Sequence, residues 1–305
     1  MAQAKARNQG YDVCIVGGGI AGLSAACQAT RWGLSVLLLE NMPLFGGQVA
    51  TVGEIEGLVG AGVEPGAALA SRLVDALRQA GGRIVEAEAR AVEASGAVLR
   101  IAVDGEVYRA RHVIAATGQR PRLLGLPGES EFLGSGVSHC ATCDGPLMRG
   151  RDVVVVGGGD AALQDALVVA KFARNVTVVS RGRLRAKPTL VDRAVRCANL
   201  RFVWDSEVVR ILGESGVEGV VLRDRAHGAP SELPCTGLFV RIGGVANSEW
   251  LPPELRDAAG QVRVGEDFST DLPQLHAIGA LRRGFSGELA TAMGEAASVL
   301  RAIAA

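Results

Sequence analysis

The chain has 305 residues, 48% of them hydrophobic, and its 32 basic and 32 acidic residues leave no net formal charge. This length allows two domains with cores of their own, and the absence of net charge argues against bulk binding to nucleic acid or to anionic membranes. No apolar run reaches membrane-spanning length and the N-terminal segment lacks the apolar core of a signal peptide, so a cytoplasmic protein is expected.

A glycine-rich turn follows the first apolar segment of the chain. Val13–Val16 predicts a buried parallel strand. It leads directly into three fingerprint glycines, Gly17, Gly19 and Gly22, and then into a helix-like segment. In such a unit the first glycine allows the tight turn, the second lets the backbone approach a pyrophosphate, and the third lets helix and strand pack closely.

The next strand of the same unit, Val36–Leu39, ends at an acidic residue, Glu40. A carboxylate at this place accepts hydrogen bonds from a ribose diol and repels a 2′-phosphate. A bare glycine-rich turn also occurs in ordinary α/β proteins, but the complete strand–helix–strand pattern with its terminal acid favours a dinucleotide site. The first site is therefore expected to bind a dinucleotide with a free ribose diol.

The segment after this site is expected to continue the first unit. A helix-like run covers Ala67–Ala80. Segments of alternating polarity predict a three-stranded meander near Arg83–Ala87, Ala97–Val103 and Val107–Arg109. A further buried strand, Val113–Ala116, ends at Thr117 and Gly118.

Two cysteines lie in Cys-x-x-Cys spacing between the two halves of the chain. Cys140 and Cys143 are close enough to form a disulfide ring, and in a reducing compartment such a pair is more often catalytic or metal-binding than structural. Zinc needs about four ligands, but only His139 is adjacent and there is no second Cys-x-x-Cys, so no metal is expected. As an imidazolium, His139 could instead stabilise a neighbouring thiolate.

The remaining cysteines and histidines are expected to be structural. Cys14 falls in the first strand and Cys27 in the first helix, where both are expected to be small core residues. No partner pattern accompanies the others, which are Cys197, Cys235, His112, His227 and His276.

The glycine pattern returns after a displacement of 140 residues. Val153–Val156 predicts a second buried strand, and Gly157 and Gly159 repeat the first two fingerprint glycines. Asp160 opens the helix that follows, and Ala162 replaces the third glycine, which the fingerprint tolerates. This internal repeat predicts a second dinucleotide site.

The strand end of the second site carries no acid. Ser180 stands where the first site has its glutamate, and three arginines follow, Arg181, Arg183 and Arg185. An arginine near the ribose accommodates a 2′-phosphate. A solvated basic loop is the alternative explanation, but the place of these arginines within the repeat favours NADPH over NADH.

The rest of the chain is expected to complete both units. Further strands are expected near Leu200–Val203 and Val217–Leu222. Ile242–Gly244 marks a return to the first unit, which His276–Gly279 and a final helix over Ala290–Ile303 complete. The sequence thus predicts an α/β fold in which one nucleotide domain, built from both chain ends, contains the other as an insertion.

Together these motifs resemble the low-molecular-weight, bacterial-type thioredoxin reductases over almost the whole chain. The matching segments are Gly17–Gly22, Gly46–Gln48, Ala116–Gly118, Cys140–Asp144, Gly157–Asp160 and Ala277–Gly279. The resemblance implies two Rossmann-like, three-layer ββα domains: an FAD-binding domain of residues 1–118 and 243–305, and an NADPH-binding domain of residues 119–242 that carries the cysteine pair. It also implies a homodimer.

The resemblance further implies a role for each residue of the central motif. Cys143 would accept electrons from the flavin, Cys140 would attack the disulfide of the partner, and Asp144 would move the proton. The implied cofactor contacts are Gly17, Gly19, Gly22, Glu40, Gly47, Gln48, Thr117, Gly118, Gly157, Gly159, Asp160, Arg181, Arg185, Gly279, Ala280 and Glu288. The expected function is electron transfer from NADPH through FAD to the cysteine pair and on to thioredoxin, a thioredoxin-like protein or a small disulfide substrate.

Several positions depart from the family pattern. Ala280 stands where the family has an aspartate that binds the ribityl chain of the flavin. Glu288 replaces a glutamine, Ser180 a histidine and Gln164 an acid. These departures leave two alternatives open. One is a dithiol oxidase, or an enzyme with another electron donor, that acts on a small-molecule or unrelated protein dithiol. The other is a redox sensor that binds flavin or nucleotide and signals through a partner.

Overall fold

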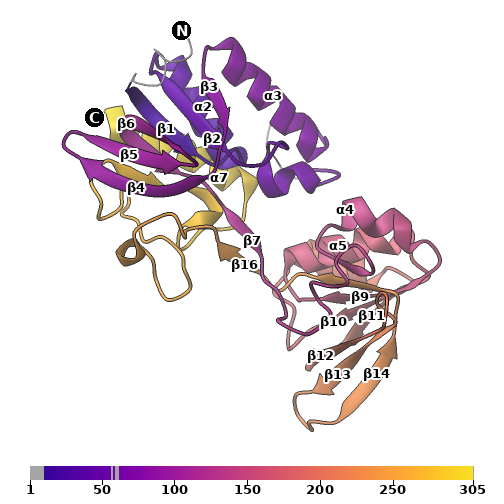
Figure 1. Ribbon diagram of the computed structural model, residues 1–305. Helices are drawn as coiled ribbons and strands as arrows, with labels where there is room; N and C mark the ends of the chain where they lie inside the picture. The colour runs from indigo at the N-terminus through magenta and orange to yellow at the C-terminus, as the bar shows by residue number, and fades with distance from the viewer. Residues whose placement is uncertain (1–9, 56–57, 59–61, 305) are drawn as a thin grey trace. The chain divides into compact units, whose positions relative to one another are not determined.

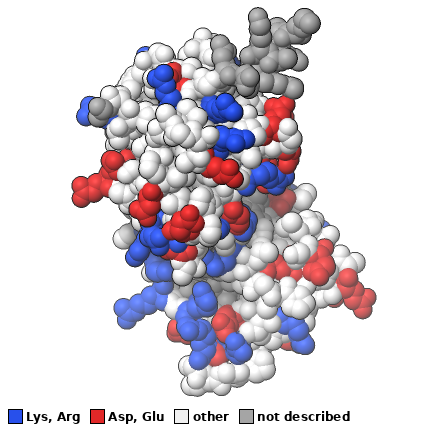
Figure 2. All heavy atoms as spheres, turned by 60° about the vertical axis from the view of Figure 1, so that its left-hand side comes forward, with Lys and Arg blue, Asp and Glu red and all other residues white. Residues whose placement is uncertain are grey.

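The computed structural model describes residues 10–55, 58 and 62–304 (Figure 1). The chain forms two compact units, one of Met1–Arg120 with Val245–Ala305 and the other of Pro121–Gly244. Each junction lies two residues from the bound expected from the sequence. Basic and acidic side chains are interspersed on the face seen in Figure 2. Within the described ranges, no helix is both long enough and apolar enough to cross a bilayer.

A seven-stranded sheet forms the centre of the first unit. Its parallel part has the order β3-β2-β1-β6, with β17 beside β6. These strands are β1 (Tyr11–Val16), β2 (Val36–Glu40), β3 (Arg83–Glu86), β6 (Glu106–Ala115) and β17 (Leu275–Ala277). Val16 lies opposite Leu39 of β2 and Ala115 of β6, so these strands end together at one edge of the sheet.

The antiparallel part of this sheet corrects the strand assignment made from the sequence. The meander consists of β4 (Ala89–Ser95), β5 (Val98–Val103) and β6. Its expected first strand, Arg83–Ala87, instead provides β3, which pairs in parallel with β2. The segments expected as two strands, Val107–Arg109 and Val113–Ala116, belong to β6, which runs continuously to Ala115. β4 was missed because it buries only two of its seven residues, so its alternation is weak.

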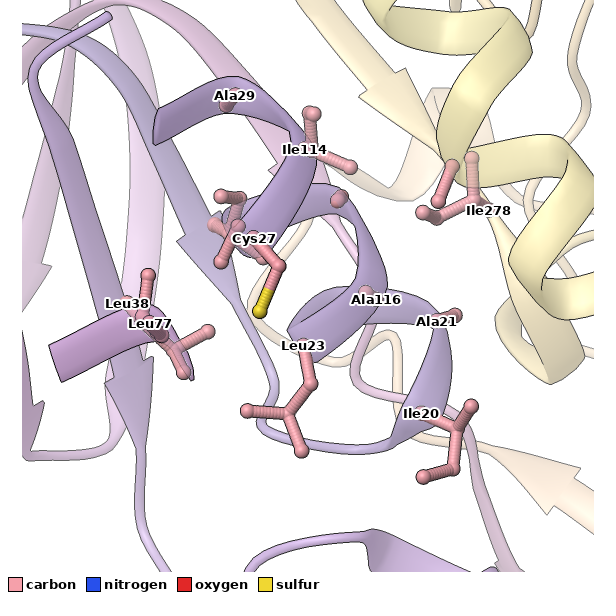
Figure 3. Close-up of a cluster of buried hydrophobic side chains, with 14 of the residues drawn as sticks. Ile20, Ala21, Leu23, Cys27, Ala29, Leu38, Leu77, Ile114, Ala116 and Ile278 are labelled. Carbon is pink, nitrogen blue, oxygen red and sulfur yellow. The ribbon is translucent and has the colours of Figure 1, made fainter. Parts of the chain in front are cut away.

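Three helices pack against one face of this sheet, namely α2 (Ile20–Arg31), α3 (Gly66–Gln79) and α7 (Leu289–Ala304). Their shared core includes Leu23 and Cys27 of α2, Leu77 of α3 and Ile114 of β6 (Figure 3). On the other face, β4 and β5 share a second core with the chain segment around Leu251. The helix, sheet and meander form the three layers predicted for the first unit.

The second unit repeats this architecture on a smaller scale. Its parallel sheet has the order β11-β10-β9-β15-β8. The strands are β8 (Val137–Ser138), β9 (Asp152–Val156), β10 (Asn175–Val179), β11 (Leu200–Val203) and β15 (Gly237–Val240). One face is covered by α4 (Ala141–Asp144), η2 (Gly145–Met148), α5 (Asp160–Ala170) and α6 (Pro188–Val195). The other is covered by the antiparallel strands β12 (Ser206–Leu212), β13 (Gly219–Asp224) and β14 (Pro230–Pro234).

The chain passes between the units twice, and the two passages pair with each other. β7 (Gln119–Pro121) and β16 (Gly244–Ala246) form a two-stranded sheet of their own. The backbone N–H of Arg122 donates to Gly243 O at 3.0 Å, and that of Asn247 donates to Gly118 O at 3.0 Å. The α/β class and the insertion of one Rossmann-like unit into the other are as predicted.

Candidate active site

The first glycine turn has the shape that a pyrophosphate requires. Gly17 has φ +110°, and a Cβ there would lie 2.4 Å from the carbonyl oxygen of Ala116. A Cβ on Gly22 would lie 1.9 Å from the carbonyl oxygen of Gly17, so helix α2 can approach β1 only through glycine. A Cβ on Gly19 would meet no atom within 4 Å. Gly19 therefore faces open space at the N-terminus of α2, where phosphate oxygens are stabilised by free N–H groups.

The acid at the end of β2 lies against this turn. The Glu40 carboxylate accepts hydrogen bonds from the N–H groups of Gly18 and Met42, the latter at 2.9 Å. The N–H of Gly46 donates to Gly18 O at 2.8 Å, and Gly47 follows with φ +56°. The structure thus brings Glu40 and Gly47, both predicted cofactor contacts, to the glycine turn.

Further predicted contacts lie at the ends of the neighbouring strands. Gln48 Nε2 donates to Gln119 O at 2.7 Å, just after β6. Thr117 Oγ1 donates to Asn247 O at 2.6 Å, and Gly118 has φ +63°. These residues follow the same sheet edge as the glycine turn, which is where ligands bind in open α/β folds.

The last predicted contacts come from the C-terminal segment. Gly279 follows β17 with φ +71°, and its N–H donates to the buried carboxylate of Glu295 at 2.7 Å. A Cβ on Gly279 would lie 3.0 Å from the methyl group of Ala21, so this turn closes onto the start of α2. Ala280 contributes no polar side-chain atom, and Glu288 immediately precedes α7. The first unit therefore fits a dinucleotide, and the ribityl contact expected at position 280 is missing.

The second glycine turn repeats the geometry of the first. Gly157 has φ +143°, and a Cβ there would lie 2.2 Å from the carbonyl oxygen of Arg241. A Cβ on Gly159 would meet no atom within 4 Å. Asp160 begins α5, and its Oδ1 accepts a hydrogen bond from the N–H of Lys187 at 2.7 Å. The turn and the open space beside it fit a second pyrophosphate.

The arginine loop folds back onto this second turn. Ser180 Oγ donates to Gly182 O at 2.8 Å, and the N–H of Arg185 donates to Gly158 O at 2.7 Å. A hollow of about 430 Å³ adjoins the loop and is lined by Gly182, Arg183, Leu184, Val191, Trp204 and Asp205. Arg183 thus belongs with Arg181 and Arg185 among the candidates for contact with a 2′-phosphate.

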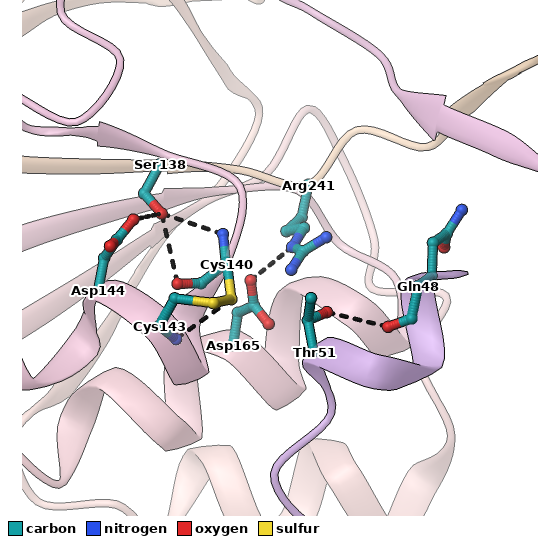
Figure 4. Close-up of a disulfide and its surroundings, with 8 residues drawn as sticks. All are labelled: Gln48, Thr51, Ser138, Cys140, Cys143, Asp144, Asp165 and Arg241. Atoms are coloured by element: carbon teal, nitrogen blue, oxygen red, sulfur yellow. Dashed lines mark hydrogen bonds and ion pairs between the residues drawn. A yellow bond between two sulfur atoms is a disulfide. The ribbon is translucent and has the colours of Figure 1, made fainter. Parts of the chain in front are cut away.

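The cysteine pair forms a disulfide at the start of α4 (Figure 4). The N–H of Cys143 donates to Cys140 Sγ at 3.1 Å. Cys143 is exposed and Cys140 is half-buried. Ser138, a buried residue at the end of β8, donates its hydroxyl hydrogen to Asp144 Oδ2 at 2.6 Å and accepts from the N–H of Cys140 at 3.0 Å. Ser138 therefore fixes the predicted proton carrier beside the sulfur atoms.

His139 occupies the position that the sequence predicts, beside Cys140. Its Nδ1 lies 3.3 Å from the carbonyl oxygen of Val240, where a protonated Nδ1 donates. Three polar residues of this region were missed as functional candidates, namely Ser138, Asp165 and Arg241. Ser138 opens the cysteine stretch but had been given no role, whereas Asp165 and Arg241 belong to no recognisable motif and meet only because α5 packs beside the end of β15.

The cysteines outside the pair do not form disulfides. Cys14 and Cys27 are buried in the core of the first unit, as expected. Burial raises the pKa of the Cys14 thiol, and it raises the pKa of Cys235 to about 12. Among the described residues, no three His, Cys, Asp or Glu side chains are grouped so that they could hold a metal ion.

Comparison with known proteins identifies the family. Residues 11–297 match the family model described as pyridine nucleotide-disulphide oxidoreductase. Thioredoxin reductase from Treponema pallidum (strain Nichols) is 35% identical over 296 residues, which cover 96% of each chain. The enzyme from Mycolicibacterium smegmatis is 38% identical over 281 residues, 89% of this chain and 88% of that one. The crystal structure of Lactococcus lactis thioredoxin reductase has a TM-score of 0.93 at 30% identity, covering 96% of this chain and 98% of that one.

The chain belongs to the pyridine nucleotide-disulphide oxidoreductase family. Within that family it is of the low-molecular-weight thioredoxin reductase type, so the resemblance drawn from its motifs is confirmed. It is a disulfide oxidoreductase whose cofactors are FAD and NADPH. These similarities favour a reductase over the dithiol oxidase that the departures from the family pattern had left open.

Proposed function

We propose that this enzyme carries electrons from NADPH to the Cys140–Cys143 disulfide and from there to thioredoxin or a thioredoxin-like protein. The observation that carries the proposal is the disulfide itself, with an exposed Cys143, in the same unit as the second glycine turn. The names of the relatives support thioredoxin as the partner. FAD, held by the first unit, would supply the two-electron transfer between the nucleotide and the disulfide.

The chain's own residues account for the exchange with the partner. The Cys140 thiolate, stabilised by the N–H of Cys143, attacks the partner's disulfide and releases one thiolate. Cys143 then attacks the mixed disulfide, which restores the Cys140–Cys143 bond and releases the second thiolate of the partner. Asp144, oriented by Ser138, takes the proton from the attacking thiol and returns it to a leaving thiolate.

A spectral titration tests this function. The purified protein should be yellow, NADPH should bleach it, and a thioredoxin should restore the colour. Cys140→Ser and Cys143→Ser should still be bleached by NADPH but should pass no electrons to thioredoxin. Cys197→Ser, at a free and half-buried cysteine of the same unit, is the matched control and should behave like the parent. A flavoprotein that NADPH bleaches and no thioredoxin reoxidises would contradict the proposed substrate.

The proposal includes a homodimer, as the sequence resemblance implies, and a cytoplasmic location, as expected from the N-terminal segment and the apolar runs of the sequence. Sedimentation equilibrium of the FAD-loaded protein would measure the oligomeric state. A mass of about twice the 31.5 kDa chain is expected. A single 31.5 kDa species at micromolar concentration would contradict the dimer.

A further inference from the structure

A partly buried ion pair lies beside the cysteine turn. Arg241, the residue after β15, donates from Nε to Asp165 Oδ2 on α5. The side chains are 22% and 14% exposed, so this pair is far better shielded from water than the surface ion pairs of the same unit. Shielded charges interact more strongly than exposed ones.

The same carboxylate is tied directly to the cysteine turn. The backbone N–H of Ala141, the residue after Cys140, faces the Asp165 carboxylate and lowers its pKa. Figure 4 shows the Asp165 side chain beside the disulfide, with Arg241 above it. The N–H of Cys143 donates to Cys140 Sγ within the turn, and the N–H of Ala141 faces the Asp165 carboxylate.

The arginine is tied in turn to the second glycine turn. The N–H of Arg241 donates to Val156 O at 2.8 Å, and its carbonyl oxygen lies so close to Gly157 that a Cβ there would approach to 2.2 Å. One ion pair thus connects the backbone that would hold the nucleotide to the backbone that holds the cysteines. No motif marks this connection in the sequence.

The charges around the turn determine what the pair does to the sulfur atoms. The titratable and charged groups that contact this turn or its neighbours are Asp144, His139, Asp165 and Arg241. A carboxylate near a thiol disfavours the thiolate, whereas a guanidinium favours it. Burial raises the pKa of Asp165, and the guanidinium of Arg241 opposes that rise, so the arginine favours the charged form of a carboxylate that burial disfavours.

We propose that Asp165 and Arg241 are positioning residues that hold the cysteine turn through Ala141 and set how readily the reduced pair forms a thiolate. The role in turnover rests on the function proposed above. The effect of the two charges on thiol ionisation does not rest on that function. A chemical reductant generates both thiols without NADPH, FAD chemistry or thioredoxin.

The experiment measures thiol ionisation directly. The purified full-length protein is reduced with dithiothreitol, freed of reductant and alkylated with iodoacetamide over a pH series, and mass spectrometry follows Cys140 and Cys143. The variants are Asp165→Asn, Arg241→Gln and the double substitution. Asp152→Asn is the matched control, because Asp152 also pairs with an arginine, Arg174, but lies at the opposite end of the parallel sheet. Circular dichroism melting verifies that each variant is folded.

Asp165→Asn keeps an acceptor for Ala141 and leaves the arginine charge uncompensated, so the apparent pKa of the more reactive thiol should fall by about one unit. Arg241→Gln leaves the carboxylate uncompensated, so that value should rise. The double substitution should return it close to that of the parent, and Asp152→Asn should not move it. Arg241→Lys keeps the positive charge and should have the same apparent thiol pKa as the parent. If Arg241→Gln does not fold, Arg241→Lys takes its place as the test of the arginine charge.

The proposal fails if Asp165→Asn leaves the apparent pKa of the more reactive thiol unchanged or raises it. It also fails if the double substitution does not return that pKa close to the value of the parent. A structural role alone would move the single variants in the same direction. If the thiol values shift as expected while thioredoxin is not reduced, the ion-pair inference stands and the proposed substrate is wrong.

Discussion

Ser138 shows how one hydroxyl group can organise a reaction that other side chains perform. It is 2% exposed and joins the Asp144 carboxylate to the N–H of Cys140. Ser138→Ala removes the hydrogen bond that orients the carboxylate and leaves the N–H unpaired. We expect thioredoxin reduction to slow by roughly 10- to 100-fold while flavin content stays unchanged.

The measurement for this variant is single-turnover reoxidation of the reduced enzyme by thioredoxin. Ser206→Ala is the control, since Ser206 is also a buried serine of the second unit but its hydroxyl donates to the carbonyl oxygen of Trp204. Equal rates for Ser138→Ala and Ser206→Ala would show that orientation of Asp144 does not matter to the exchange.

A second prediction at this scale concerns the arginine loop and the choice between NADPH and NADH. Arg181→Glu combined with Arg185→Glu should reverse the preference for NADPH over NADH. Each charged hydrogen bond to a phosphate is worth about 1.5–3 kcal/mol, so the ratio of kcat/KM values should change by at least about 100-fold. Arg196→Glu, at an exposed arginine at the end of α6, controls for the replacement of a surface arginine by an acid elsewhere in the same unit. An unchanged ratio would remove the assignment of this loop to the 2′-phosphate.

Residues with a local signature could be predicted from the sequence, and residues without one could not. Gly17, Glu40 and Gly157 could be identified because each occupies a fixed place in a strand–turn–helix pattern. Asp165 and Arg241 are 76 residues apart in sequence, and their contact exists only once α5 and β15 have packed in the second unit. A single sequence holds no information on which distant charges will meet.

Helix α2 depends on a glycine inside its first turn. A Cβ on Gly22 would lie 1.9 Å from a backbone oxygen that cannot move without opening the glycine turn. Gly22→Ala should therefore lower both the melting temperature and the flavin bound per chain. Gly294→Ala is the control within α7, where a Cβ meets nothing within 4 Å and alanine should stabilise the helix by about 0.5–1 kcal/mol.

For the two variants Gly22→Ala and Gly294→Ala, thermal melting measures stability, and flavin absorbance after gel filtration measures the flavin bound per chain. Equal flavin content in Gly22→Ala and Gly294→Ala would contradict the role assigned to close packing at α2. The second unit carries Ala162 at the equivalent place, so its helix tolerates the methyl group that α2 is expected to reject.

Elements with strong periodicity were predicted well, and edge elements were not. The helices α2, α3, α5 and α7 and the buried strands β1, β2 and β9 were predicted from apolar runs and glycine positions, whereas α4 and α6 were not predicted. β3 was given the wrong partner because its residues are only partly buried at the sheet edge, where polarity does not distinguish a parallel edge strand from a hairpin strand. The partner of such a strand is therefore determined by the arrangement of the whole sheet and not by the residues of the strand itself.

At the scale of the molecule, a buried histidine predicts how stability depends on pH. His276 is 6% exposed, and neither ring nitrogen has a hydrogen-bond partner. Burial, and then His112, lower its pKa to about 4, against a smaller opposing effect of Asp267. The unfolded chain binds a proton near pH 6.5 and the folded chain does not, so stability is lost as the pH falls from about 6.5 to about 4, by up to about 1.4 kcal/mol per pH unit.

His276→Gln should flatten this acid limb because the glutamine cannot titrate. The measurement is the melting temperature of the first unit between pH 7.5 and 4.5. His227→Gln alters an exposed histidine and should keep the slope of the parent. Parallel curves for all three proteins would show that protonation of His276 is not linked to unfolding.

The insertion of one unit into the other dictates an order of completion during translation. β17 and α7 are synthesised after the whole of the second unit, and they supply a strand of the first sheet and part of its helical layer. Residues 121–244 leave the ribosome before them, so the second unit can fold while the first still lacks its final strand and helix. We therefore expect flavin to bind only after these two elements have been made, so a nascent chain halted before residue 275 should already display a folded second unit but no flavin.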